Sequence, residues 1–453
     1  ATFQANLDNQ VKPWIKFSTN LTGSFDNKTN GDYSMSDLLK SIPALPMFKE
    51  DGVTYNGPTG NALWWGDKKN QVGTAEINKN RTQGYNFLLS ETMEIQLPIP
   101  VLKFKSTESV GATFVISESF RPEYPWAPNP QAKTERWAQS SRYMSYLADN
   151  YLTYDATFGK HTISAMAGNS LQWGDSWYMN GQKKGFLSDS ASQFNNGTEI
   201  ESLNGTRTEW AIASFMGRAN WSYDDRYMLT ATVRYDGSSK FGPGYRWGMF
   251  PSFAGAWRIS QEDWFPKNRT LSYLKLRLGY GVTGNSAIEP YQTKGSIVSL
   301  FYPYGSAATP GYTTYDMLIS GGSVTMANQN LTWEKTKQWN LGLDFNFLRG
   351  RINGTFDIYT SRTTDLLMLQ AIPTLTGYAS SYNNIGETKN FGYDITLNFV
   401  PVRTKDLEWT VGINAAYTKN EIVSLANGKE DDVANGWFIG ESTWVIYDYV
   451  SDG

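Results

Sequence analysis

The amino-acid sequence predicts an all-β fold, a large antiparallel up-and-down β-barrel that crosses a membrane. Three observations predict it: apolar and polar residues alternate in long runs, short and long connections alternate between the runs, and aromatic residues gather at the run ends. Alternation indicates strands because successive side chains of a strand point to opposite faces. A soluble β-sandwich alternates in the same way, so alternation alone does not separate the two folds.

Alternating runs recur along the whole chain, and the clearest are 15–25, 152–158, 215–223, 227–235, 253–259, 274–280, 339–347, 391–399 and 407–413. The apolar face of the cleanest run carries Trp339, Leu341, Leu343, Phe345 and Phe347. We count about fourteen such strands, and most reach the ~9–11 residues that a membrane-spanning strand needs. The length of these strands favours a barrel over a sandwich.

The connections between the runs fall into two classes. Short polar turns are expected at 158–162, 223–227, 348–351 and 400–407, and long loops at roughly 26–80, 173–208, 284–330, 361–388 and from 419 onward. Short turns at one end and long loops at the other are typical of an up-and-down outer-membrane barrel. Helix is confined to a turn or two at 36–39 and 261–265, which Pro46 and Pro266 end.

Aromatic residues lie near predicted strand ends, at Trp14, Trp247, Trp257 and Trp409. Such positions favour a membrane interface. Mean hydropathy is −0.46 and no apolar run approaches ~18 residues, which excludes a helical membrane protein. The net charge of −3 gives no support to a nucleic-acid partner.

The residue types argue against an enzyme. The chain has no cysteine and one histidine, His161, which is expected in a tight turn, so zinc sites and Cys- or His-based catalysis are excluded. The sequence Gly279-x-Gly281-x-x-Gly284 lacks the βαβ context of a dinucleotide site and is interpreted as the end of a strand. The acidic groups at 224–225 and 430–432 lack calcium-loop spacing. We therefore predict no catalytic residues, no cofactor and no metal.

Aromatic residues in the predicted long loops are the candidates for substrate binding. They stand beside Asn, Asp and Lys, and they are Trp64, Trp65, Trp173, Trp177, Tyr178, Tyr302 and Tyr304. Flat rings next to hydrogen-bonding side chains can grip a sugar or an extended peptide. The alternative is that these rings pack the loops together or contact a partner protein.

One stretch, 226–265, also carries a resemblance. Its RYDGSSKFG and RWGMFPSFAGAWRISQEDWF segments closely resemble the barrel of SusC/RagA-type TonB-dependent outer-membrane transporters of Bacteroidetes. Further matching segments follow in order, at 283–291, 331–344, 351–367 and 384–394. Asp394 departs from the family, which usually has Glu there, but keeps the charge.

The resemblance implies an architecture. The family's barrel has on the order of 22 strands with a plugged lumen, long extracellular loops and short periplasmic turns. Residues 1–453 are therefore expected to be the middle part of one barrel domain, with the N-terminal plug, the TonB box and the closing C-terminal strands outside this chain. The implied location is the bacterial outer membrane, in contact with its lipid.

The resemblance also implies a function: TonB-dependent active import of a nutrient, either a glycan oligosaccharide or an oligopeptide. The expected partners are a SusD-like surface lipoprotein and TonB, with ExbB and ExbD, acting through segments outside this chain. The sequence leaves open whether two transporter–lipoprotein pairs form a dimer. The rival hypotheses are a passive porin or adhesin barrel and a soluble carbohydrate-binding β-protein.

Overall fold

The computed structural model describes residues 1–40, 46–57, 70–124, 131–187, 193–266, 270–294, 298–304, 307–313, 325–376, 378–426, 428 and 430–448. The side chains of 298–304, 307–310, 312, 313 and 374 are outside this description. The chain divides into two compact units. Unit 1 comprises Ala1–Met93, Thr107–Ala148 and Gln172–Glu209, and unit 2 comprises Glu94–Ser106, Asp149–Leu171 and Trp210–Gly453.

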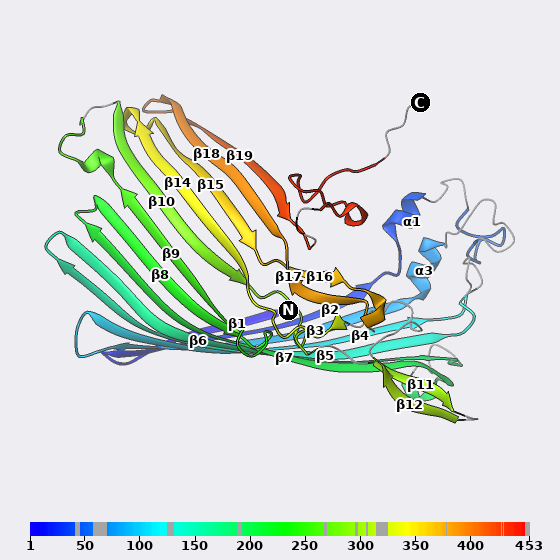
Figure 1. Cartoon of the computed structure of the whole chain (residues 1–453). Helices are drawn as coiled ribbons and strands as arrows, with labels where there is room; N and C mark the ends of the chain where they lie inside the picture. The colour runs from blue at the N-terminus through cyan, green and yellow to red at the C-terminus, as the bar shows by residue number, and fades with distance from the viewer. Residues whose placement is uncertain are drawn as a thin grey trace. The chain divides into compact units, whose positions relative to one another are not determined.

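Strands dominate the described residues and pair in the order of the sequence. One 14-stranded sheet contains β1 (Thr2–Lys12), β2 (Ile15–Asn30), β3 (Lys79–Gln96), β4 (Leu102–Arg121), β5 (Glu135–Phe158), β6 (His161–Lys184), β7 (Glu199–Tyr223), β8 (Tyr227–Ser238), β9 (Trp247–Trp257), β10 (Leu271–Asn285), β14 (Glu334–Phe347), β15 (Ile352–Thr364), β18 (Glu387–Arg403) and β19 (Glu408–Ser424). In unit 2, β8, β9, β10, β14 and β15 run side by side (Figure 1). The predicted strand number and pairing of neighbours are confirmed.

Short elements occupy the connections. They are α1 (Met35–Lys40), α3 (Gln71–Ile77), the hairpin of β11 (Val298–Tyr304) with β12 (Ala307–Thr313), and a small sheet of β13 (Thr325–Met326), β16 (Leu367–Ala371) and β17 (Ser380–Asn384). Single 3₁₀ turns lie at η2 (Phe194–Asn196), η3 (Ile259–Gln261), η4 (Leu348–Gly350), η5 (Thr374–Thr376) and η6 (Val433–Asn435). Among the described helices, none has the length and apolar character needed to cross a membrane.

Short and long connections alternate as predicted, with two corrections. The expected loop 173–208 is wrong, because β6 continues to Lys184 and β7 already begins at Glu199. The helical turn expected at 261–265 is instead a 3₁₀ turn at Ile259–Gln261. The predicted helix at 36–39 is confirmed within α1.

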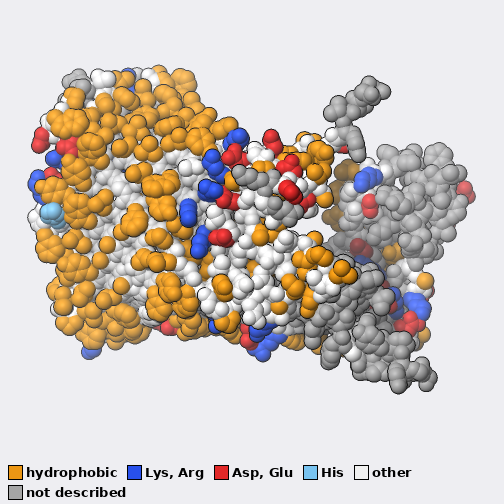
Figure 2. Space-filling model, viewed as in Figure 1, with side chains coloured by type: hydrophobic (Ala, Val, Ile, Leu, Met, Phe, Trp, Pro, Cys, Tyr) orange, Lys and Arg blue, Asp and Glu red, His pale blue; other side chains and the backbone are white. Residues whose placement is uncertain are grey.

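The alternation separates two faces of the sheet in unit 2. Leu278 lies opposite Gly255 on one side and Leu341 on the other, and Leu341 lies opposite Ile358. Leu278 and Leu341 remain 51% and 45% exposed, so nothing within the described chain covers this apolar face. Hydrophobic side chains gather over β8, β9, β10, β14 and β15 in Figure 2. We call this surface the outer face.

The opposite face of the same strands is polar and carries an ion cluster. Arg277 donates from Nε to Asp344 Oδ1 at 2.9 Å and from Nη2 to Asp357 Oδ2 at 2.9 Å. Gly342 lies opposite both Arg277 and Asp357, and a Cβ there would come within 2.5 Å of the guanidinium. Gly342 therefore leaves room for the guanidinium beside its carboxylates, and a Cβ there would push these side-chain ends aside. Charged groups on this face fit a wet lumen and not hydrocarbon.

A buried aromatic cluster packs the long connections at the far end of unit 2. It contains Phe241, Phe250, Ile288, Leu331 and Trp333. Trp333 donates its indole N–H to the Arg246 carbonyl at 2.7 Å, which fixes two connections to each other. A Cβ at Gly284 would come within 2.1 Å of the Phe250 ring, so this glycine makes room for the cluster. Gly279, Gly281 and Gly284 all lie inside β10, which is consistent with a structural role.

Glu262 anchors the connection after β9. Its carboxylate accepts hydrogen bonds from Tyr227 Oη at 2.6 Å, Trp257 Nε1 at 2.8 Å and Arg226 Nη1 at 3.1 Å. The hydrogen bond from Tyr227, followed by that from Trp257, holds the pKa of Glu262 below its ordinary value of 4.5. Glu262 thus ties the start of β8 to the end of β9.

The outer face predicts a first mutational outcome. Leu341→Arg should lower the free energy of unfolding by about 2–4 kcal/mol if this face meets the middle of a bilayer. Gln338→Arg on the polar face is the matched control and should cost much less, because its side chain reaches water. Urea unfolding of the full-length protein in lipid vesicles measures both, and equal costs would contradict the assignment of faces.

The Glu262 anchor predicts a pH dependence. Because the folded pKa is lower than the unfolded one, the carboxylate stabilises the fold above about pH 4.5 and loses this contribution as the pH falls through the folded pKa. Glu262→Gln should therefore lower the unfolding midpoint at pH 7 and flatten its fall on acidification. An unchanged pH profile in thermal unfolding would show that Glu262 does not act this way.

Candidate ligand-binding site

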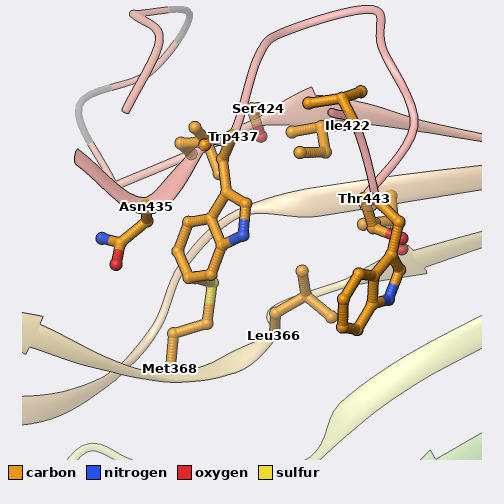
Figure 3. A pocket seen from close by; sticks show the side chains of 12 residues that line it. Leu366, Met368, Ile422, Ser424, Asn435, Trp437 and Thr443 are labelled. Atoms are coloured by element: carbon orange, nitrogen blue, oxygen red, sulfur yellow. The ribbon is translucent and has the colours of Figure 1, made fainter. Parts of the chain in front are cut away.

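A cavity of about 540 Å³ lies where the long connections after β15 and β19 meet, within unit 2. Figure 3 shows Trp437 above Met368, with Ile422 and Thr443 on the other side of the opening. The remaining lining residues are Leu366, Thr388, Ser424, Leu425, Asn435, Gly436, Trp444 and Val445. This is the candidate site.

The floor of the cavity is held by the small sheet between β15 and β18. Leu367 of β16 lies opposite Asn384 of β17, and Asn384 donates from its side chain to the Thr332 and Asp365 carbonyls at 2.8 and 2.9 Å. Gly386 then turns the chain with φ 83°, a conformation that favours glycine. These contacts place Met368 under the opening.

The roof is built by the segment after β19, which folds back on its own strand. Ile422 donates its N–H to the Glu441 carbonyl at 2.9 Å and accepts from Gly440 N–H at 2.8 Å. Asn420 Oδ1 accepts from the Ser442 hydroxyl and from Thr443 N–H, both at 2.9 Å. These four bonds fix the stretch that carries Thr443 and Trp444.

The orientation of Trp437 has its own local cause. Asp432 caps the 3₁₀ turn η6 by accepting from Asn435 N–H at 3.1 Å, and its backbone exchanges hydrogen bonds with Trp437 at 2.8 and 2.9 Å. Gly436 between them adopts φ 69°, in the left-handed region. A tight turn thus presents the indole of Trp437 to the cavity.

The lining combines flat rings with hydrogen-bonding groups. Trp437 is half-buried and Trp444 is 90% exposed, so a ligand can reach both indoles. The hydroxyls of Ser424 and Thr443 and the amide of Asn435 stand beside them. Rings with adjacent amide and hydroxyl groups suit a sugar ring or an extended peptide, whose apolar face can stack while its polar edge is hydrogen-bonded.

A second cavity of about 580 Å³ adjoins the first and shares Met368, Leu425, Asn435 and Trp437 with it. It adds the carboxylates of Glu430, Asp431 and Asp432. Asp431 accepts from Ile439 N–H at 2.7 Å and Asp432 caps η6, so both have structural roles. Across the described residues, no group of three or more His, Asp or Glu side chains is placed to hold a metal.

The residues predicted from the sequence do not form this site. Trp173, Trp177 and Tyr178 lie in strand β6 and not in a loop, so that expectation is corrected. Tyr302 and Tyr304 lie in β11, with side chains outside the description, and Trp64 and Trp65 lie outside the described residues.

Trp437 and Trp444 were missed, although the predicted loop from 419 onward contains both. For Trp437 the available signal was the same one used elsewhere, an aromatic residue near Asn in a long connection, whereas Trp444 follows Thr443 and lacked it. Met368 carried no such signal, because a methionine in a loop has no distinctive neighbours.

Comparisons with known proteins give a consistent result. Residues 3–445 match the family model described as TonB dependent receptor-like, beta-barrel. TonB-dependent receptor P26 of Formosa agariphila is 30% identical over 433 residues, which is 93% of this chain and 42% of the relative. TonB-dependent receptor SusC of Bacteroides thetaiotaomicron is 36% identical over 290 residues, 62% of this chain and 27% of the relative.

A solved structure of the RagAB peptide transporter superposes with a TM-score of 0.82 at 25% identity, covering 97% of this chain and 49% of that chain. The chain thus spans less than half the length of each of these three proteins. The predicted barrel fold and the resemblance to SusC/RagA-type receptors are confirmed.

Trp437→Ala should weaken ligand binding up to about tenfold, because a stacked ring contributes roughly 0.5–1.5 kcal/mol beyond its buried area. The measurement is the amount of oligosaccharide or oligopeptide that copurifies with the full-length protein, read by mass spectrometry. Trp409→Ala, near the start of β19 and outside the cavity, is the control and should retain the bound molecule. Equal retention in the two variants would contradict the assignment.

Proposed function

The chain belongs to the TonB-dependent receptor-like β-barrel family, and from this premise we propose that it is part of an active nutrient importer. The barrel lies in the bacterial outer membrane, as its SusC- and RagA-type relatives do. The observation that carries the proposal is the match over residues 3–445, which includes almost every described strand.

We propose that the imported substrate is an oligomer, either a glycan oligosaccharide or an oligopeptide. The cavity supports this class, because two accessible indoles with neighbouring hydroxyl and amide groups suit successive rings or residues of an extended chain. The RagAB structure is described as a peptide transporter, which makes a peptide a reasonable first probe. No covalent step is part of the proposal.

The proposed partners follow from the same relatives. A SusD-like lipoprotein would meet the barrel at the end where the long connections lie, and TonB, with ExbB and ExbD, would act through parts of the whole protein beyond this barrel segment. Residues 1–453 would then contribute to one barrel domain. Substrate would be held between the lipoprotein and the long connections before entering the lumen.

The experiment compares cells that produce the full-length protein with cells that lack it, each supplied with fluorescent oligopeptides or oligosaccharides. We expect uptake to require the protein and to stop when a protonophore collapses the proton gradient, while binding at the cell surface persists. Uptake that continues without the gradient would contradict active import and favour a passive porin. A freely diffusing monosaccharide serves as the control solute.

A further inference from the structure

A groove crosses β7, β8, β9 and β10 on the outer face of unit 2. It consists of two adjoining hollows of about 530 and 480 Å³, which share Trp221, Leu229, Gly255 and Leu278. Nearly all lining side chains are apolar. The hollows are therefore one continuous feature of the surface that faces hydrocarbon, and they are separate from the cavity described above.

Three small residues create the groove. Ala219 lies opposite Ala231, and Gly255 lies opposite both Leu229 and Leu278. A Cβ on Gly255 would touch Leu229 at 3.4 Å, so leucines bound the space above the glycine on each side. Neighbouring positions in the same rows carry larger side chains, among them Trp221, Phe253 and Tyr280, so the three small residues form the floor of the groove.

The groove fits within the depth of one leaflet. The pair Tyr227 and Trp257 forms its lower end, by which we mean the end next to the short turn between β7 and β8. From Tyr227 to Ala231 is four residues, or ~13 Å along an extended strand, and a strand tilted by ~45° covers ~9 Å of the ~15 Å depth of one leaflet over that distance. Short turns of outer-membrane barrels face the periplasm, so the groove lies in the inner leaflet.

The lower end carries groups of both signs. Asp263 and the 66%-exposed ring of Trp264 follow Glu262, and the Arg258 guanidinium lies 5.2 Å from the Tyr273 ring centre. Trp257 and Trp264 pack edge to face at this level, as interfacial rings do. A zwitterionic headgroup, with one ammonium and one phosphate, matches such a mixed border better than an anionic one.

We propose that the groove is a binding site for one acyl chain of an inner-leaflet phospholipid with a zwitterionic headgroup. A hollow that faces hydrocarbon forfeits dispersion contacts unless a chain fills it. Association within a bilayer depends on such packing, since lipid and protein surfaces are equally apolar. An acyl chain lying over Ala219, Ala231 and Gly255 restores these contacts and is ordered by Trp221 and Leu278 on either side.

The test fills the groove and measures lipid retention. Full-length wild type, Ala219→Leu and Ala231→Leu are purified in detergent and titrated with dipalmitoyl phosphatidylethanolamine, and bound lipid is counted by native mass spectrometry. We expect about tenfold weaker retention in either groove variant. Two variants are used so that a folding defect in one, seen as lost heat-modifiable gel mobility, leaves the other decisive.

The matched control is Ala415→Leu, at an exposed position on the outer side of β19, opposite Ile395 and away from the groove. It adds the same side chain to the same face and should retain lipid like wild type. Equal retention in all four proteins would overturn the proposal. So would a groove variant that disrupts a dimer while keeping its lipid, because the groove would then hold a second copy of the protein.

Discussion

Backbone pairing in a medium without water is the constraint on which this structure depends. Inside hydrocarbon every N–H and C=O group needs a protein partner, and a strand finds its partners only in its neighbours. The pairing of β14 with β15 accordingly runs without a shift from Lys335 and Thr364 to Phe347 and Ile352. Register shifts in β10 and β18 fall near strand ends, at Leu271/Tyr273, Glu387/Thr388 and Phe399/Val402, where water can replace a lost partner.

Once pairing is continuous, alternate side chains of each strand point to opposite faces, so apolar residues gather on one face and polar residues on the other. Leu341 and Gly342 are neighbours in sequence, yet one joins the outer face and the other makes room for Arg277 among its carboxylates. The long connections lie outside the membrane. They pack around buried side chains, among them Phe250 and Trp333. The candidate cavity belongs to this second layer, where the segment after β19 folds over β16.

Much of the strand arrangement could be predicted, because a strand that crosses hydrocarbon carries apolar side chains on the face that meets lipid and polar ones on the other. The run 339–347 shows it without a break, and β14 follows it closely. The prediction failed at 173–208, where Asn180, Gln182 and Lys183 make the sequence polar on both faces. Beyond the bilayer a strand keeps its hydrogen bonds but meets water on either side, so β6 continues after the alternation has disappeared.

The site was less predictable for a related reason. Trp437 is oriented by the Asp432 cap and by Gly436 in the left-handed region, and such loop geometry has no period that a sequence displays. Trp173 and Trp177 offered the same composition but lie in β6. Residue type could suggest candidates for binding, whereas the hydrogen bonds of the Asn420 side chain and the Ile422 backbone decided which of them meet.

The separation of the two faces can be measured directly with single introduced cysteines, because residues 1–453 contain no cysteine and any cysteine elsewhere in the full-length protein can be replaced by serine. Nitroxide labels at positions 338, 340, 341 and 343 of β14, in the full-length protein in lipid vesicles, would report collision with oxygen, which enriches in hydrocarbon, and with a polar nickel complex. Positions 341 and 343 should show high oxygen and low nickel accessibility, and positions 338 and 340 the reverse. Similar accessibility at all four positions would contradict the separation of the faces.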